Sequence, residues 1–223
     1  MDWPALVLSL ELAFWTTAIL TPAGVAIARV LAWRRFAAKG LIEAMIALPL
    51  VLPPTVLGYY LLTGFGSGSS LGRVYEYLFG QPLAFTFQGL LVASIIFNLP
   101  FAIQPVQRAL EGLPAHVREA AWCSGLSRWR TFWRIEMPLG WFGILSAMVL
   151  TFAHTLGEFG VVLMVGGNIP GETRTVAISI YDRAQAFDDQ TAGTMSALLL
   201  TFSFAAIAMV YVISYQVGPR RER

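Results

Sequence analysis

The sequence predicts an all-α integral membrane protein with about five transmembrane helices, forming one domain over residues 1–223. Hydrophobic residues make up 57% of the chain and charged residues only 13%, and the mean hydropathy of +0.65 is too high for an ordinary soluble domain. A helix that crosses a hydrocarbon layer about 30 Å thick needs about 20 apolar residues. Five apolar stretches approach or exceed this length, at approximately 5–33, 41–63, 85–103, 139–165 and 195–217.

The basic residues indicate how these helices are oriented. Most of the fifteen lie at the end of the first, third or fifth stretch or in the segment that follows it, and the others lie on the opposite side. Because loops rich in arginine and lysine stay in the cytoplasm, we expect an outer N-terminus, a cytoplasmic C-terminus and a place in the plasma (inner) membrane. The first group is Arg29, Arg34, Arg35, Lys39, Arg108, Arg118, Arg128, Arg130, Arg134, Arg220, Arg221 and Arg223; the second is Arg73, Arg174 and Arg183.

Two features predict contacts between helices. Gly24 and Ala28 lie four residues apart in the first stretch, a spacing that lets another helix approach closely, although a lipid-facing surface fits equally well. Asn98 in the third stretch is expected to hydrogen-bond across a helix interface, with substrate contact as the alternative.

The second stretch contains Pro49, Pro53 and Pro54 near its middle. An interior proline removes a helix hydrogen bond and clashes with the preceding turn, so we expect this helix to be kinked or broken. Non-helical backbone inside a membrane is tolerated where it is buried in protein or faces a watery cavity. Pro53, Pro54 and Thr55 are therefore candidates for a translocation path, and a structural kink without substrate contact is the alternative.

The fourth stretch is the most polar and contains His154, Thr155, Gly157 and Glu158. Ionisable residues inside a membrane are costly and usually face a bundle interior or a cavity. His154 and Glu158 would share one helix face if Gly157 does not break the helix, and they are expected to support packing or a gate. A zinc site is not expected, because it would need at least three convergent ligands and the only other histidine, His116, lies in a cytoplasmic loop.

A cytoplasmic loop is expected at approximately 108–138, and within it residues 118–138 are the longest charged interval of the chain. Helix-forming residues before Gly125 and after Leu126 predict two short helices joined by a sharp turn. An exposed helix of this kind fits a groove on a partner protein. A basic amphipathic helix lying on anionic lipid is a competing interpretation that can coexist with the first. Its residues would be Arg128, Trp129, Arg130, Trp133 and Arg134.

The spacing within this segment is specific. Glu119-Ala120-Ala121 is followed after three residues by Gly125, and after nine more by Ile135, one residue and Met137-Pro138. This pattern resembles the EAA loop of ABC-transporter permease subunits, with Met137 where leucine is usual. Residues 48–62 (LPLVLPPTVLGYYLL) and 157–175 (GEFGVVLMVGGNIPGETRT) further resemble the molybdate branch of that family.

The resemblance implies a type I ABC importer permease fold and a non-catalytic transport subunit. It implies a homodimer that binds two cytoplasmic ABC ATPase subunits and an extracytoplasmic substrate-binding protein, with no nucleic acid. It implies no cofactor in this chain, since the partner uses the ATP, in agreement with the absence of a phosphate-binding glycine loop with its lysine. The positions that match the coupling element are Glu119, Ala120, Ala121, Gly125, Ile135 and Pro138.

The implied substrate is an oxyanion. The GETRT segment favours molybdate, and tungstate or sulfate/thiosulfate are the alternatives. A different class, a self-sufficient ion-coupled secondary transporter, would also have broken helices and would need intramembrane ionisable groups such as His154 and Glu158.

Overall fold

The computed structural model describes residues 1–217, and every regular element within this range is helical. Four continuous segments are long and apolar enough to cross a membrane, and a pair of helices bent by 110° gives a fifth where it is counted as one span. The prediction of an all-α protein with about five transmembrane helices is confirmed. The continuous segments are α1 (Trp3–Trp33), α5 (Phe87–Glu111), α8 (Met137–Gly157) with the residues from Arg128 before it, and α11 (Asp189–Val217); the bent pair is α2 (Lys39–Val51) and α3 (Pro54–Phe65).

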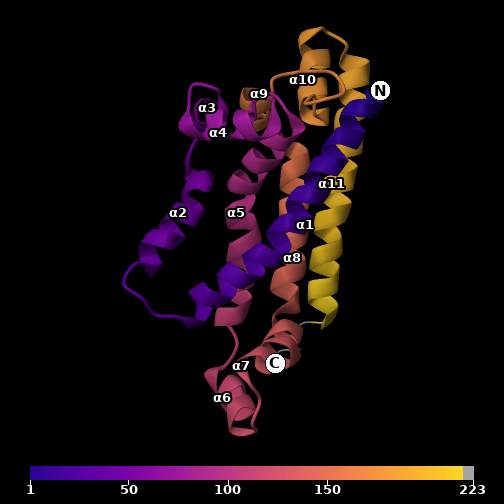
Figure 1. The fold of residues 1–223 in the computed structure, drawn as a ribbon. Coiled ribbons are helices and arrows are strands. Elements are labelled where there is room, and N and C mark those ends of the chain that lie inside the picture. Colours follow the sequence, from indigo (N-terminus) through magenta and orange to yellow (C-terminus); the bar gives the residue numbers. More distant parts are fainter. Residues whose placement is uncertain (218–223) are drawn as a thin grey trace.

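The shorter helices gather at the two ends of the bundle (Figure 1). The N-terminus, α3, α4 (Ser70–Phe79), α9 (Gly160–Gly166) and α10 (Val176–Gln185) lie at one end. At the other end lie α6 (Ala115–Cys123) and α7 (Arg128–Thr131), together with the described end of α11. The chain therefore begins at the end opposite to α6, as the distribution of basic residues predicts.

The centre of the bundle is formed by α1, α5 and α8, which pack on one another. A Cβ atom added at Gly24 would lie 2.7 Å from the carbonyl oxygen of Ala102, and Ala28 is fully buried. The close approach of α1 and α5 confirms that Gly24 and Ala28 serve helix packing. The core cluster at this contact contains Val25, Ala28, Leu31, Ile46, Ile103, Val106, Leu110, Phe132 and Ala147.

The second predicted stretch, 41–63, is broken as expected, at Leu52 and Pro53. Both residues have extended backbone, with ψ of 136° and 135°. A residue before proline is driven away from helical geometry, and here two consecutive residues precede a proline. Pro22, Pro100 and Pro105, each without an adjacent proline, lie inside continuous helices.

The prediction of one helix over 139–165 is wrong. Helix α8 ends at Gly157, Glu158 is extended with ψ of 130°, and α9 starts at Gly160. The hydropathy of the segment stays high across the break, because Phe159 and the valines of α9 are as apolar as a helix interior. The Glu158 carboxylate accepts a hydrogen bond from the N–H of Val161 in the first turn of α9, so a new helix starts where hydropathy gives no signal.

Two other predicted ends are displaced. Helix α5 continues to Glu111 instead of ending near Ile103, because hydropathy marks the hydrocarbon region and not the end of the helix. Helix α11 begins at Asp189, six residues before the apolar run, where the carboxylate of Asp188 accepts a hydrogen bond from the backbone N–H of Thr191 at 3.3 Å.

Candidate functional site

The segment between α5 and α8 forms the two short helices that the sequence predicts. Helix α6 ends in a turn where the N–H of Gly125 donates to the carbonyl of Trp122 at 2.9 Å and the N–H of Leu126 donates to that of Ala121 at 3.0 Å. Gly125 has φ of +80°, a left-handed conformation that glycine adopts without strain. The sharp turn and the need for glycine at this position are confirmed.

The residues of the predicted coupling element differ in exposure. Glu119, Ala120 and Gly125 are exposed, whereas Ala121 is buried on the inner face of α6. Ile135 is half-buried and Pro138 is exposed at the start of α8. The outer face of α6 is thus open to a partner, and its inner face packs on the protein.

Glu136 holds this segment to the bundle, and the sequence interpretation missed it. Its side chain is fully buried and accepts hydrogen bonds from Arg29 Nε of α1 at 2.5 Å and from Arg118 Nε of α6 at 3.2 Å. The Arg118 guanidinium lies over the Trp33 ring at 3.8 Å, and Arg29 also donates to the carbonyl of Arg128 at 3.2 Å. One carboxylate therefore connects α6, α1 and the start of α8.

Glu136 lies in η1 (Phe132–Glu136), a π-helical turn between α7 and α8. Such turns are rare and often occur at functional sites, because the extra residue redirects the side chains that follow. No spacing rule identifies the partner of a glutamate in a loop with several arginines. The buried charge could be recognised only from the fold.

The two helix breaks of the predicted path meet in space. A Cβ atom added at Gly160, just after the break in the fourth stretch, would lie 2.7 Å from Cβ of Pro54 at the break in the second. A Cβ atom added at Gly58 of α3 would lie 2.7 Å from Cβ of Met164 of α9. The glycines allow α3 and α9 to pack closely, so residues about a hundred positions apart form one irregular region.

The predicted path residues surround this region with different exposure. Pro53, Pro54 and Thr55 are exposed on the side of α2 and α3. Glu158 and Thr155 are buried, with 8% and 3% of their surface exposed. The region therefore presents one open side and one buried polar side.

His154 and Glu158 form no hydrogen bond or ion pair with each other among residues 1–217, and each has a different partner. Glu158 Oε1 accepts a hydrogen bond from the N–H of Val161 at 2.8 Å and so satisfies the first turn of α9. His154 Nδ1 lies 3.1 Å from Oδ1 of Asn98, and its ring stacks on Phe101. The condition under which the two would share one helix face is not met, because Gly157 is the last residue of α8.

The Asn98 interaction joins α5 to α8. Asn98 is fully buried, and its Nδ2 also donates to the carbonyl of Ser94 at 2.8 Å. The prediction of a hydrogen bond across a helix interface is confirmed.

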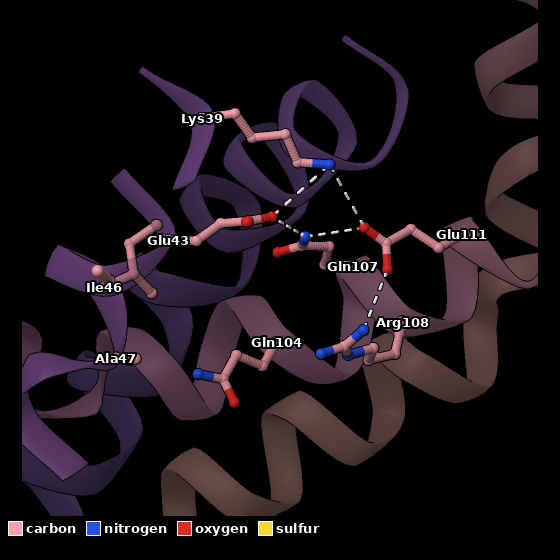
Figure 2. A pocket seen from close by; sticks show the side chains of 9 residues that line it. Lys39, Glu43, Ile46, Ala47, Gln104, Gln107, Arg108 and Glu111 are labelled. Atoms are coloured by element: carbon pink, nitrogen blue, oxygen red, sulfur yellow. Dashed lines mark hydrogen bonds and ion pairs between the residues drawn. The ribbon is translucent and has the colours of Figure 1, made fainter. Parts of the chain in front are cut away.

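A polar cleft of about 470 Å³ opens between α2 and α5, and the sequence interpretation missed it as well (Figure 2). Gln107 Nε2 donates to Glu43 at 2.6 Å and to Glu111 at 2.9 Å, and Lys39 lies 3.7 Å from both carboxylates. Arg108 pairs with Glu111 at 3.5 Å. These two acids and two bases neutralise one another and connect the two helices.

Comparisons with known proteins agree with this arrangement. The model of the family described as "Binding-protein-dependent transport system inner membrane component" matches residues 3–223. The chain is 45% identical over 210 residues to the molybdenum transport system permease protein ModB of Azotobacter vinelandii, covering 94% of this chain and 93% of that protein. It is 30% identical over 214 residues to a probable sulfate transport system permease protein of Zygnema circumcarinatum, covering 94% and 74%.

A solved structure has the same fold. A chain of a bacterial ABC transporter involved in the import of the acidic polysaccharide alginate superposes with a TM-score of 0.77 at 14% identity, covering 96% of this chain and 79% of that one.

Proposed function

Because the chain belongs to the family of binding-protein-dependent transport system inner membrane components, a family of non-catalytic multi-pass subunits, we propose that it is the permease of an ATP-driven molybdate importer. The substrate assignment rests on the 45% identity to a molybdenum permease over almost the whole of both chains. The probable sulfate permease at 30% identity supports sulfate/thiosulfate as the alternative, and tungstate is a second one because it is the same size and charge as molybdate.

The proposal assigns α6 and the turn that follows to binding of a cytoplasmic ABC ATPase. Glu119, Ala120 and Gly125 form the exposed surface, while Ile135 and Pro138 connect it to α8. ATP is hydrolysed in that partner, and this chain holds no cofactor. The open outer face of α6, fixed at its inner side by Arg118 and Glu136, supports this role.

The proposal further includes a homodimer with two ATPase subunits and an extracytoplasmic binding protein. Large apolar side chains are exposed along α2, α3 and α11, such as Val51 at 80% and Phe204 at 72%. Surfaces of this kind suit lipid or a second copy of the chain. Two copies would enclose the exposed side of the irregular region at Pro53, Pro54 and Thr55.

The translocation path would run past the two helix breaks. Irregular backbone at membrane depth is expected where a cavity or another protein surface satisfies it. Thr155 and Gly157 lie at the break on the α8 side, and Glu158 fixes the geometry there. His154 supports this wall through Asn98, so the ion-coupled transporter, which would need His154 and Glu158 as exchanging groups, is the weaker candidate.

Reconstitution tests the function and the substrate. The permease, the ATPase encoded beside it and the cognate binding protein are placed in proteoliposomes, and uptake of molybdate is measured with tungstate or sulfate as competitor. ATP-dependent uptake of molybdate that excess sulfate does not inhibit is the expected result. Preferential transport of sulfate would overturn the substrate assignment, and uptake driven by an ion gradient without ATP would overturn the function.

Co-purification tests the docking surface separately. Gly125→Pro and Glu119→Lys are expected to lose the ATPase while remaining in the membrane. Retention of the ATPase by both variants would contradict the assignment of α6.

A further inference from the structure

A second cleft, of about 290 Å³, lies where the end of α1 meets α6 and α7. Four arginines line it, together with two tryptophans and the aliphatic Val30. The arginines and tryptophans are Arg29, Arg34, Arg118, Arg128, Trp33 and Trp122.

The positive charge of this cleft is not balanced by the residues around it. Arg29 and Arg118 both pair with Glu136, which is fully buried behind them. Within residues 1–217, Arg34 and Arg128 form no ion pair, and both are exposed. The cleft is thus lined by four guanidinium groups, and only two of them are paired with a carboxylate.

The cleft of α2 and α5 makes a useful contrast. There Lys39 and Arg108 are each paired with a carboxylate, and the charges cancel. Four arginines with one acid leave an excess of three positive charges, so the α1–α6 cleft favours an anion.

The geometry points to a phosphate group as the ligand. One guanidinium group can donate two parallel hydrogen bonds to two oxygens of a phosphate. Several guanidinium groups at one cleft offer more N–H donors than the two oxygens of a carboxylate can accept. Glu136 accepts from Nε of Arg29 and Nε of Arg118, and Nη2 of Arg29 also donates to Glu136 at 3.4 Å and to the carbonyl of Arg128 at 3.2 Å. Nη1 of Arg29 and both terminal nitrogens of Arg118 form no hydrogen bond within residues 1–217, so they can donate to a further acceptor.

The surroundings of the cleft are typical of the boundary between membrane and water. Trp33 ends a membrane-spanning helix, and the neighbouring Trp129 and Trp133 are exposed, with 65% and 52% of their surface accessible. Tryptophan is enriched at the boundary between membrane and water, and the cytoplasmic leaflet carries anionic lipids.

We propose that the cleft between α1 and α6 binds the phosphate group of an anionic lipid. The lipid would bridge a transmembrane helix and the segment that faces the ATPase. Free inorganic phosphate offers the same chemistry, and the experiment separates the two sources.

The test uses the full-length permease and measures binding of phosphatidylglycerol by native mass spectrometry, with phosphatidylcholine as the neutral reference. The variant Arg34→Gln/Arg128→Gln removes two charges from the cleft and leaves the pairs of Glu136 intact. We expect its affinity for phosphatidylglycerol to fall about 10- to 30-fold, given the usual contribution of each basic residue at an anionic surface.

The matched control is Arg130→Gln/Arg134→Gln, which removes the same charge from exposed positions outside the cleft. It is expected to keep most of the affinity. An equal loss in the control would mean general surface attraction, and unchanged binding in the cleft variant would mean that no lipid site exists there. Either result overturns the proposal.

Two further arms identify the occupant. Inorganic phosphate that displaces phosphatidylglycerol at millimolar concentration would assign the cleft to a free anion. Loss of the co-purified ATPase with unchanged lipid binding would assign it to a protein, and both outcomes refute a lipid site. The measurement needs neither ATP nor molybdate, so a failure of the proposed transport function leaves its result unaffected.

Discussion

The buried carboxylate of Glu136 connects α6 and α1 in the segment that we propose to bind the ATPase. Glu136→Gln keeps the size of the side chain and one acceptor oxygen but removes its charge. Arg29 and Arg118 would then face each other across an uncharged amide. Removal of one partner from a buried ion pair costs roughly 3–5 kcal/mol.

The structure lowers this estimate. The side chains of Arg29 and Arg118 retain 30% and 15% of their exposed surface, so water can solvate part of the released charge. The remaining amide oxygen can accept part of the three hydrogen bonds that the carboxylate accepts from Arg29 and Arg118. A loss of roughly 2–3 kcal/mol is therefore expected, close to the contribution of a hydrogen bond to a charged group.

The functional consequence follows from the position of the pair. Arg118 belongs to α6 and Arg29 to α1, so the variant is expected to weaken the connection between the proposed ATPase contact and the transmembrane helices. In proteoliposomes, we expect the ratio of ATP hydrolysed to molybdate imported to rise, while the ATPase remains bound. Glu136→Asp, which keeps the charge, should restore part of the coupling.

The matched control is Glu76→Gln on α4, since Glu76 forms no ion pair among residues 1–217. Its thermal stability and its coupling ratio should equal those of the wild type. If Glu136→Gln is equally unaffected, the buried pair neither stabilises the segment nor transmits its movement, and the reasoning fails.

Three further substitutions test the local geometry. Gly125→Ala places a side chain at φ of +80° and should cost roughly 1–2 kcal/mol of folding stability. It should also weaken co-purification of the ATPase, whereas Gly112→Ala, at φ of −72°, should not. Equal retention of the ATPase by both variants would contradict the need for glycine in this turn. Gly160→Ala forces Cβ toward Pro54, and about 1–3 kcal/mol of overpacking should lower thermal stability and uptake. The control Gly64→Ala on α3 meets nothing within 4 Å and should change neither. Equal uptake by the two variants would show that the close contact between the two breaks does not matter for transport. Glu158→Ala removes the hydrogen-bond acceptor for the first turn of α9, so it should cost roughly 1 kcal/mol of stability and reduce uptake. Glu158→Gln should recover stability and uptake in part. Full uptake by the alanine variant would show that this hydrogen bond is not needed for transport.

The sequence predicts those features that depend on local chemistry. The break at Pro53 follows from two adjacent prolines, and the turn at Gly125 follows from glycine between two helix-forming segments. The interface role of Asn98 follows from the cost of burying an amide among apolar side chains.

Features that depend on distant partners could not be predicted. Glu136 and Arg29 are 107 residues apart, and nothing in the spacing of the loop favours this pair over the other arginines. The contact between Gly160 and Pro54 likewise depends on how α3 and α9 pack. The break after Gly157 lies between these cases, because its local cause, a carboxylate that binds a nearby N–H, is hidden by the high hydropathy around it.

Helix α1 is bonded to neighbouring elements near both of its ends, which would let a movement of α6 reach the opposite side of the bundle. At one end Arg29 is paired with Glu136. At the other end the hydroxyl of Ser179 donates to Asp2 at 2.9 Å, and the N–H of Val176 donates to the hydroxyl of Ser9 at 2.8 Å, so that α1 is joined to α10. Because α1 is continuous over its 31 residues and carries both sets of contacts, a displacement of α6 transmitted through Glu136 is expected to shift α10 along with it.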